Sequence, residues 1–245
     1  MTSIGIIGSK GRMGHALVNA IGERDELSHA GGVDQDDDFA ALLSNCDVLV
    51  DFSTPVGLAE RLDLCAKAGK PIVVGTTGLE PAHHLSIDAA GKSIPVLQTG
   101  NTSLGVTMLA ALVKEAAARL GDDWDIEIVE MHHRHKVDAP SGTALLLGEA
   151  AAKGRGIKLD DHSERGRDGH TGARAKGAIG FASLRGGSVA GDHQVILATD
   201  EERIELIHRA ENRMIFARGA VKAALWLTQQ KPGRYDMTDM LGLKS

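Results

Sequence analysis

The sequence predicts an α/β protein, in which a doubly wound parallel sheet is followed by a second domain of the α+β type. Two observations lead to this prediction. Over residues 1–100, short apolar runs of strand length alternate with helix-like segments, as in a parallel sheet covered by helices. After an Ala- and Leu-rich helical segment at 103–120, strand-like runs follow one another with few helices between them, which favours a mixed or antiparallel sheet.

The first part contains apolar runs that we expect to form parallel strands. Helix-like segments at 12–21 and 55–68 follow the first two runs, and Pro55 stands near a helix start, where proline is tolerated. Ligands of such sheets bind at the carboxyl ends of the strands. The expected strands are 3–7, 47–52, 71–74 and 94–97.

Alternation of apolar and polar residues predicts the strands of the second part. At 203–208, for example, Ile204 and Leu206 alternate with Arg203 and Glu205. Residues 154–177 are rich in Gly, Arg, Asp and His and are expected to form a long loop, whereas 217–228 return to helix. The expected strands of this part are 125–131, 177–185, 188–198 and 203–208.

Composition excludes several classes of protein. The hydrophobic fraction of 42% argues against global disorder, and a net charge of -6 gives no reason to expect nucleic-acid binding. Cys46 and Cys65 lie in apolar surroundings and are expected to be buried, reduced thiols. The first apolar run ends at Gly8, without signal-peptide features, so a soluble cytoplasmic protein is expected.

A glycine-rich segment, Gly8-Ser9-Lys10-Gly11-Arg12-Met13-Gly14, closes the first strand and opens the first helix. Glycines at such a turn allow a pyrophosphate to approach the backbone, and the helix N-terminus then stabilises it. Asp34 follows Gly14 by 20 residues, where a carboxylate can accept from the adenosine ribose hydroxyls. This context predicts a Rossmann-like dinucleotide site; the alternative is a turn without a ligand and an ordinary surface aspartate.

The choice between NADH and NADPH stays open. Asp34 would repel a 2′-phosphate, whereas Lys10 and Arg12 could attract one. Two later segments, Gly75-Thr76-Thr77-Gly78 and Gly100-Asn101-Thr102-Ser103, follow strands of the same sheet. Each either contacts the nicotinamide half of the cofactor or is simply a turn and a helix cap.

Residues 130–143 crowd titratable side chains in front of a helix start. Histidines and a lysine supply proton donors near neutral pH, and the free N–H groups of the following helix favour an anion. The combination suits a substrate that carries carboxylates. The segment reads Glu130-Met131-His132-His133-Arg134-His135-Lys136-Val137-Asp138-Ala139-Pro140-Ser141-Gly142-Thr143.

Together with Gly11-Arg12-Met13-Gly14, Gly75-Thr76-Thr77-Gly78 and Ile179-Gly180-Phe181, this segment resembles the dihydrodipicolinate reductase family. The resemblance covers essentially the whole chain. It implies NADH- or NADPH-dependent reduction of 4-hydroxy-tetrahydrodipicolinate to tetrahydrodipicolinate, with loss of water, in diaminopimelate and lysine biosynthesis. It also implies a homotetramer assembled through the sheet of the second domain, and no metal.

The resemblance assigns roles to individual positions. The catalytic residues of the family fall on His132 and Lys136. Thr102 departs from the family, which more often has an aromatic residue there, and Gln35 replaces an arginine of some relatives, which favours NAD. Substrate binding falls on His133, Gly142 and Thr143, and cofactor binding on Gly8, Ser9, Lys10, Gly11, Arg12, Met13, Asp34, Gly75, Thr76, Thr77, Thr99, Gly100, Asn101 and Thr102.

These assignments predict a dinucleotide-binding domain at 1–102 and 213–245, and a substrate-binding and oligomerisation domain at 103–212, with hinges near 102 and 213. Arg174, Arg185, His193 and Arg213 are interpreted as surface or structural residues.

Two alternative functions remain. Three histidines at 132, 133 and 135 could bind zinc in a hydrolase, although the spacing is not that of a helical zinc motif. A nucleotide-binding redox sensor would bind the cofactor without turnover.

Overall fold

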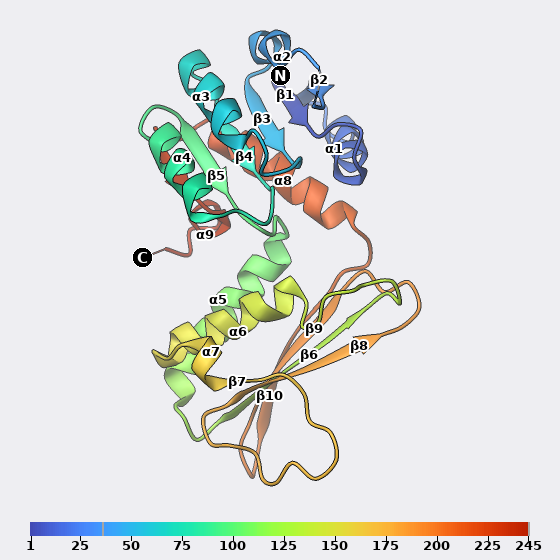
Figure 1. Ribbon diagram of the computed structural model, residues 1–245, viewed down its shortest axis with the longest axis vertical. Coiled ribbons are helices and arrows are strands. Elements are labelled where there is room, and N and C mark those ends of the chain that lie inside the picture. The colour runs from blue at the N-terminus through green and yellow to red at the C-terminus, as the bar shows by residue number, and fades with distance from the viewer. Residues whose placement is uncertain (36, 245) are drawn as a thin grey trace. The chain divides into compact units, whose positions relative to one another are not determined.

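The computed structural model describes residues 1–35 and 37–244 of the chain. It divides into two compact units, of which the first comprises Met1–Leu104 and Arg213–Ser245 and the second Gly105–Asn212 (Figure 1). Within the described residues, no helix has both the length and the apolarity needed to cross a membrane.

The first unit is built on a parallel sheet with the strand order β11-β5-β4-β3-β1-β2, and all its strand pairs are parallel. This confirms the predicted doubly wound sheet. Its strands are β1 (Thr2–Ile7), β2 (Leu27–Val33), β3 (Val48–Asp51), β4 (Ile72–Val74), β5 (Pro95–Gln98) and β11 (Gly233–Tyr235). Its helices are α1 (Arg12–Gly22), α2 (Phe39–Asn45), α3 (Leu58–Ala68), α4 (Pro81–Gly91), α8 (Met214–Leu227) and α9 (Met237–Met240).

Helices cover both faces of this sheet because alternate strand residues point to opposite sides. Ile6 of β1 packs in one hydrophobic cluster with Leu17 of α1 and Val221 of α8. Its neighbour Ile7 belongs to a second cluster, with Leu62 of α3. Each such buried side chain contributes about 1.5–3 kcal/mol relative to its exposure to water. With both faces covered, the strand ends and their loops remain for binding a ligand.

The second unit contains a mixed sheet with the strand order β10-β9-β6-β8-β7, as predicted. Strand β6 pairs parallel with β8 and antiparallel with β9. One face packs against α5 and α6 through a cluster that includes Ile128, Val113 and Leu147 (Figure 1). The strands are β6 (Asp125–His132), β7 (Ser163–Glu164), β8 (Ile179–Arg185), β9 (Asp192–Ala198) and β10 (Arg203–Arg209), and the helices are α5 (Leu104–Leu120), α6 (Gly142–Arg155) and α7 (Leu159–His162).

The loop predicted at 154–177 is wrong in its first part. Helix α6 runs to Arg155, and α7 and β7 follow before the chain becomes irregular. Leu159 anchors α7 because its side chain is buried in the cluster beneath α6. A single apolar residue among polar ones gives no periodic signal, so the sequence pattern missed this short helix. Helix α8 also begins earlier than predicted, at Met214.

A buried ion pair ties the loops of the first unit together. Asp51, at the end of β3, is fully buried, and the Nε of Arg61 lies 2.9 Å from its Oδ2. Asp51 also accepts from the Ser53 hydroxyl at 2.6 Å and from the Thr76 hydroxyl at 3.2 Å. The carboxylate therefore joins the loops after β3 and β4 to helix α3.

We predict that Arg61→Ala lowers the free energy of unfolding by about 3 kcal/mol, because it leaves the buried Asp51 carboxylate without its cationic partner. Arg218→Ala is the matched control, since Arg218 pairs with Glu23 at 2.8 Å on the exposed surface of the same unit. Loss of this surface pair should cost at most about 1 kcal/mol. Chemical denaturation of both variants measures their free energies of unfolding. Equal losses in the two variants would show that the buried pair stabilises the protein no more than the surface pair.

Candidate active site

The glycine-rich loop leaves the N-terminus of α1 open to a ligand. A Cβ on Gly14 would lie 2.2 Å from the carbonyl oxygen of Ser9, so no other residue fits that position. Gly8 adopts a positive φ of 84°, the left-handed region that favours glycine. Gly11 caps α1 without a side-chain hydrogen bond. The first-turn N–H groups of α1 are therefore suited to an anion, as the sequence predicts.

The structure brings Asp34 together with this loop. Its Oδ2 accepts from the Ser9 hydroxyl at 2.8 Å and from the Lys10 backbone N–H at 3.1 Å. The Lys10 ammonium lies 3.3 Å from Asp37, whose pKa is lowered by the backbone N–H of Asp34 and by Lys10. Ser9, Lys10 and Asp34 thus form one polar cluster at the carboxyl ends of β1 and β2.

The other predicted cofactor segments follow β4 and β5 in the same sheet. A Cβ on Gly75 would come within 2.4 Å of the Phe52 ring, so the loop after β4 needs this glycine. The side-chain oxygen of Asn101 accepts from the Ser103 N–H at 2.9 Å, in the manner of a helix cap. Thr102 is buried, and its hydroxyl donates to the Phe216 carbonyl at 2.7 Å. The Thr102 side chain therefore joins this loop to α8.

His132 is the last residue of β6, and a buried carboxylate holds its ring. The Nδ1 of His132 lies 2.5 Å from Oε2 of Glu130, two residues earlier on the strand. Arg185, at the end of β8, donates to both oxygens of Glu130 at 2.9 and 3.0 Å. Burial acts to raise the pKa of Glu130, but hydrogen bonds from Arg185 and His132 outweigh it, so the pKa is lowered and the carboxylate is ionised.

Lys136 follows on a turn after β6. Its ammonium lies 2.8 Å from both carboxylate oxygens of Asp138, and this contact lowers the pKa of Asp138. The backbone N–H of His133 donates to the Val189 carbonyl at 2.8 Å, which fixes the beginning of the turn. Asp138 thus contacts the predicted catalytic lysine directly.

The start of α6 completes this cluster. Ser141 is the N-cap, and its hydroxyl oxygen accepts from the Ala144 N–H at 3.2 Å. His193 of β9 contacts the same hydroxyl at 3.2 Å and packs edge-on against the His132 ring, with centroids 5.0 Å apart. Burial and the neighbouring His132 lower the pKa of His193 to about 4, so His193 is neutral at neutral pH. Gly142 is exposed and Thr143 half-buried at the first turn.

Three members of this cluster were not among the residues predicted for the site: Glu130, Arg185 and His193. A signal for Glu130 was present, because it occupies an inward position of β6 between Ile128 and His132. A charged residue at such a position requires a partner. The partners themselves come from β8 and β9, and nothing in a single sequence shows which strands pair. The interpretation of Arg185 and His193 as structural residues outside the site therefore needs correction, since both contact it.

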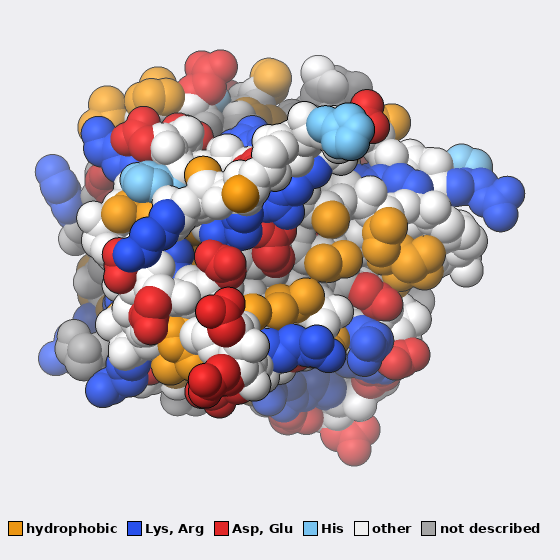
Figure 2. Space-filling view, turned by 90° about the horizontal axis from the view of Figure 1, so that it is seen from below, with side chains coloured by type: hydrophobic (Ala, Val, Ile, Leu, Met, Phe, Trp, Pro, Cys, Tyr) orange, Lys and Arg blue, Asp and Glu red, His pale blue; other side chains and the backbone are white. Residues whose placement is uncertain are grey.

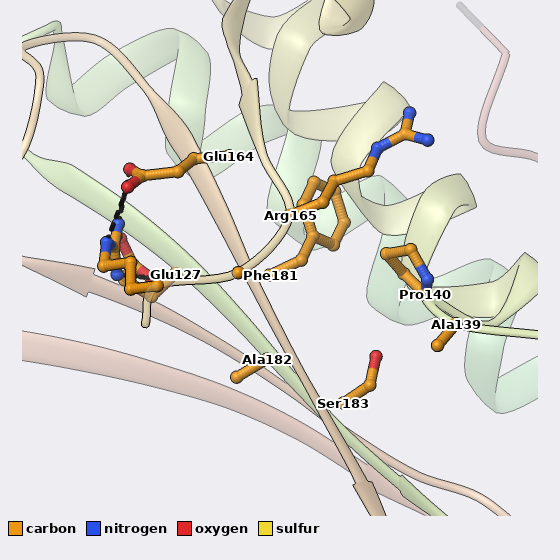
Figure 3. Close-up of a pocket in the computed structure, with 10 residues that line it drawn as sticks. Glu127, Ala139, Pro140, Glu164, Arg165, Phe181, Ala182 and Ser183 are labelled. Carbon is orange, nitrogen blue, oxygen red and sulfur yellow. Dashed lines mark hydrogen bonds and ion pairs between the residues drawn. The ribbon is translucent and has the colours of Figure 1, made fainter. Parts of the chain in front are cut away.

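A cavity of about 420 Å³ lies beside this cluster in the second unit. Its lining includes Pro140 from the histidine-containing segment, Phe181 and Ser183 from β8, and Arg165 (Figure 3). Glu164 and Arg167 form an ion pair at its wall, at 2.7 Å. Neither His132 nor Lys136 lines this cavity, so the two predicted catalytic side chains lie outside it.

The zinc alternative requires His, Cys, Asp or Glu side chains to converge in a group of at least three. Among residues 1–35 and 37–244, no such group is found. The rings of His133 and His135 lie with their centroids 6.3 Å apart, and His132 turns its Nδ1 to Glu130. The three histidines are therefore not arranged around a common point.

Comparisons with known proteins cover almost the whole chain. The family model for the N-terminus of dihydrodipicolinate reductase matches residues 2–102, and the model for its C-terminus matches 105–241. A 4-hydroxy-tetrahydrodipicolinate reductase from Zymomonas mobilis is 57% identical, over 98% of this chain and 97% of that protein. A reductase of the same name from Parvibaculum lavamentivorans is 51% identical, with the same coverage.

A solved structure has the same fold. Dipicolinate-bound dihydrodipicolinate reductase from Paenisporosarcina sp. TG-14 superposes with a TM-score of 0.77, at 23% identity, over 98% of this chain and 99% of that chain. At this identity the likeness supports the fold alone, and the family follows from the sequence matches. The chain belongs to the dihydrodipicolinate reductase family.

Proposed function

We propose that this protein reduces 4-hydroxy-tetrahydrodipicolinate to tetrahydrodipicolinate with NADH or NADPH, in diaminopimelate and lysine biosynthesis. The family uses NAD(P)H, and curated relatives at 48–57% identity carry the name of this activity. The observation that carries the proposal is the cluster in which His132, Lys136 and the N-terminus of α6 follow one another at the end of β6.

The reaction consumes one hydride and one proton and releases water. The nicotinamide supplies the hydride when the cofactor is bound, and a protein group must supply the proton to the neighbouring ring carbon. His132 has this role in the proposal, because its Nδ1 is engaged by Glu130 and its Nε2 is left to donate. Lys136 assists departure of the substrate hydroxyl as water. Both residues act on the substrate directly and are therefore proposed as catalytic.

The substrate is proposed to bind through its carboxylates. His133 and Lys136 supply cationic or N–H donors, and Gly142 and Thr143 supply the backbone and hydroxyl donors at the start of α6. A carboxylate that reaches Lys136 would replace Asp138, which now holds the ammonium at 2.8 Å. The proposed site therefore exchanges an internal ion pair for one with the substrate.

The cofactor is proposed to bind the first unit, with NADH favoured and NADPH accepted. Asp34 would receive the adenosine ribose hydroxyls in place of Ser9 and the Lys10 N–H, which it now binds. Gln35 carries no charge for a 2′-phosphate, whereas Lys10 could reach one. The remaining contacts are assigned to Gly8, Gly11, Arg12, Met13, Gly75, Thr76, Thr77, Thr99, Gly100, Asn101 and Thr102, and no metal is assigned.

The same proposal assigns a separate function to each unit. The predicted dinucleotide-binding residues, 1–102 and 213–245, lie in the first unit, and 105–212 form the second. We propose that the second unit also assembles a homotetramer through the sheet face opposite α5 and α6. Leu184 and Ile207 are 50% and 41% exposed there. Seen from below, the molecule shows hydrophobic side chains between Lys, Arg, Asp and Glu side chains (Figure 2). A cytoplasmic location completes the proposal.

The first test is turnover with substrate made in situ by its synthase, measured as loss of NADH absorbance. We expect Lys136→Ala to lower kcat by roughly 100-fold or more, since a positioned proton-transfer group contributes that much. Lys153→Ala removes a lysine from the last turn of α6 and should leave kcat unchanged. Wild type that binds NADH without turnover would instead support the redox-sensor alternative, and a fully active Lys136→Ala would exclude the lysine from the chemistry.

The second test concerns cofactor preference. We expect Asp34→Ala to raise the ratio of kcat/KM for NADPH to that for NADH by about tenfold, because it removes a charge that repels the 2′-phosphate and an acceptor for the ribose hydroxyls. Asp25→Ala is the matched control. It also removes one aspartate, but Asp25 precedes the first residue of β2, whereas Asp34 follows the last. An unchanged ratio in Asp34→Ala, or an equal change in the control, would remove Asp34 from the cofactor site.

A further inference from the structure

We propose that Glu130, held by Arg185, is the positioning residue that fixes the tautomer and orientation of the His132 ring. This inference rests on the proposed role of His132 as the proton donor. It adds that the donor works as a unit of three side chains from two parallel strands, rather than as a histidine alone. In that unit Glu130 touches His132, while Arg185 acts through Glu130.

The strand geometry makes the contact between Glu130 and His132 specific. The two residues are two positions apart on β6, so their side chains leave the sheet on the same face. Glu130 is 1% exposed and His132 is 8% exposed, so the 2.5 Å contact between Oε2 and Nδ1 is shielded from water. Arg185 is the register partner of His132 on the neighbouring strand β8, which brings its guanidinium beside the same carboxylate.

The contact determines which nitrogen can give up a proton. A carboxylate accepts hydrogen bonds only, so Nδ1 of His132 must carry the proton that faces Glu130. The second proton of the imidazolium then resides on Nε2, which faces Gly191. A Cβ at position 191 would lie 3.0 Å from this atom, so any larger residue at this position would crowd Nε2. Proton donation leaves the neutral ring in the tautomer that Glu130 already binds, without ring rotation.

Glu130 is the carboxylate that contacts the His132 ring, and the other titratable groups packed there do not replace its charge. Burial lowers the pKa values of both His193 and His208, so these two rings are neutral at neutral pH. The Asp138 carboxylate is bound by Lys136. The groups that face this region are Glu130 from β6, Arg185 from β8, His193 from β9, His208 from β10, and Lys136 and Asp138 from the turn.

The same carboxylate also fixes the substrate side of the cluster. Oε1 of Glu130 accepts from the backbone N–H of Ser141, the N-cap of α6, at 3.3 Å. Arg185 donates in addition to the Asp138 carbonyl at 2.6 Å, on the turn that carries Lys136. Glu130 and Arg185 therefore set the distance between the proton donor and the proposed anion-binding helix start.

The test compares Glu130→Gln with Glu127→Gln. Both carboxylates lie on β6 and are bound by arginines, but Glu127 faces the opposite side of the sheet, where it contacts Arg167 and Arg174. We expect Glu130→Gln to lower kcat at least about tenfold, with NADH affinity unchanged, and Glu127→Gln to keep the wild-type kcat.

A spectroscopic measurement makes the result independent of turnover. In the free protein, nitrogen NMR of the neutral His132 ring should show the proton on Nδ1, whereas Glu130→Gln should raise the fraction protonated on Nε2, because a glutamine amide can donate to Nδ1. If Glu130→Gln does not fold, Arg185→Lys keeps the positive charge but loses the paired donors to Glu130, and should lower kcat and leave the His132 ring in a mixture of tautomers.

The outcomes separate the two proposals. An unchanged ring tautomer and an unchanged kcat in a folded Glu130→Gln would overturn the positioning role, while active wild type would leave the reductase proposal standing. A changed tautomer in a protein that never turns over the substrate would support the positioning of His132 and sink the reductase proposal. A loss of kcat with an unchanged tautomer would assign Glu130 a purely structural role and also overturn the inference.

Discussion

A buried carboxylate must be neutralised by donors, and each unit of this protein meets that constraint at the end of a strand. Asp51 is fully buried where β3 ends, and Glu130 is buried two residues before β6 ends. An unpaired charge at either place would cost several kcal/mol. The donors therefore come from several segments of the chain, and their convergence fixes loops that packing alone would leave less well defined.

The two carboxylates organise different functions. Asp51 gathers Ser53, Thr76 and Arg61, and so connects two loops at the edge of the sheet where the cofactor is proposed to bind. Glu130 gathers Arg185, His132 and the N–H of Ser141, and so connects the proposed proton donor to the proposed anion site. In each unit the strand fixes the position of the carboxylate, and the carboxylate holds polar groups at the end of the strand.

Much of the fold could be predicted from local patterns. The alternation of strands and helices predicted the parallel sheet. The alternation of apolar and polar residues predicted the strands of the mixed sheet. Local patterns did not predict β2, α2 or α4, and they failed for short elements such as α7, β7 and β11, which have too few residues to show a period. They failed also for polar partners far apart in sequence. Arg185 reaches Glu130 only because β8 pairs in parallel with β6, and that register depends on the whole second unit.

Arg185 matters to the charge balance of proton donation as well as to geometry. With His132 protonated, the cluster contains two cations and one anion, and donation of the proton leaves the Arg185–Glu130 pair balanced. Without Arg185, donation would leave a buried carboxylate with no cation, which is unfavourable. Arg185 therefore keeps the Glu130 carboxylate paired both before and after His132 gives up its proton. A neutral amide in place of Glu130 would offer one acceptor oxygen where the carboxylate offers two, and could not accept from Arg185, Ser141 and His132 together.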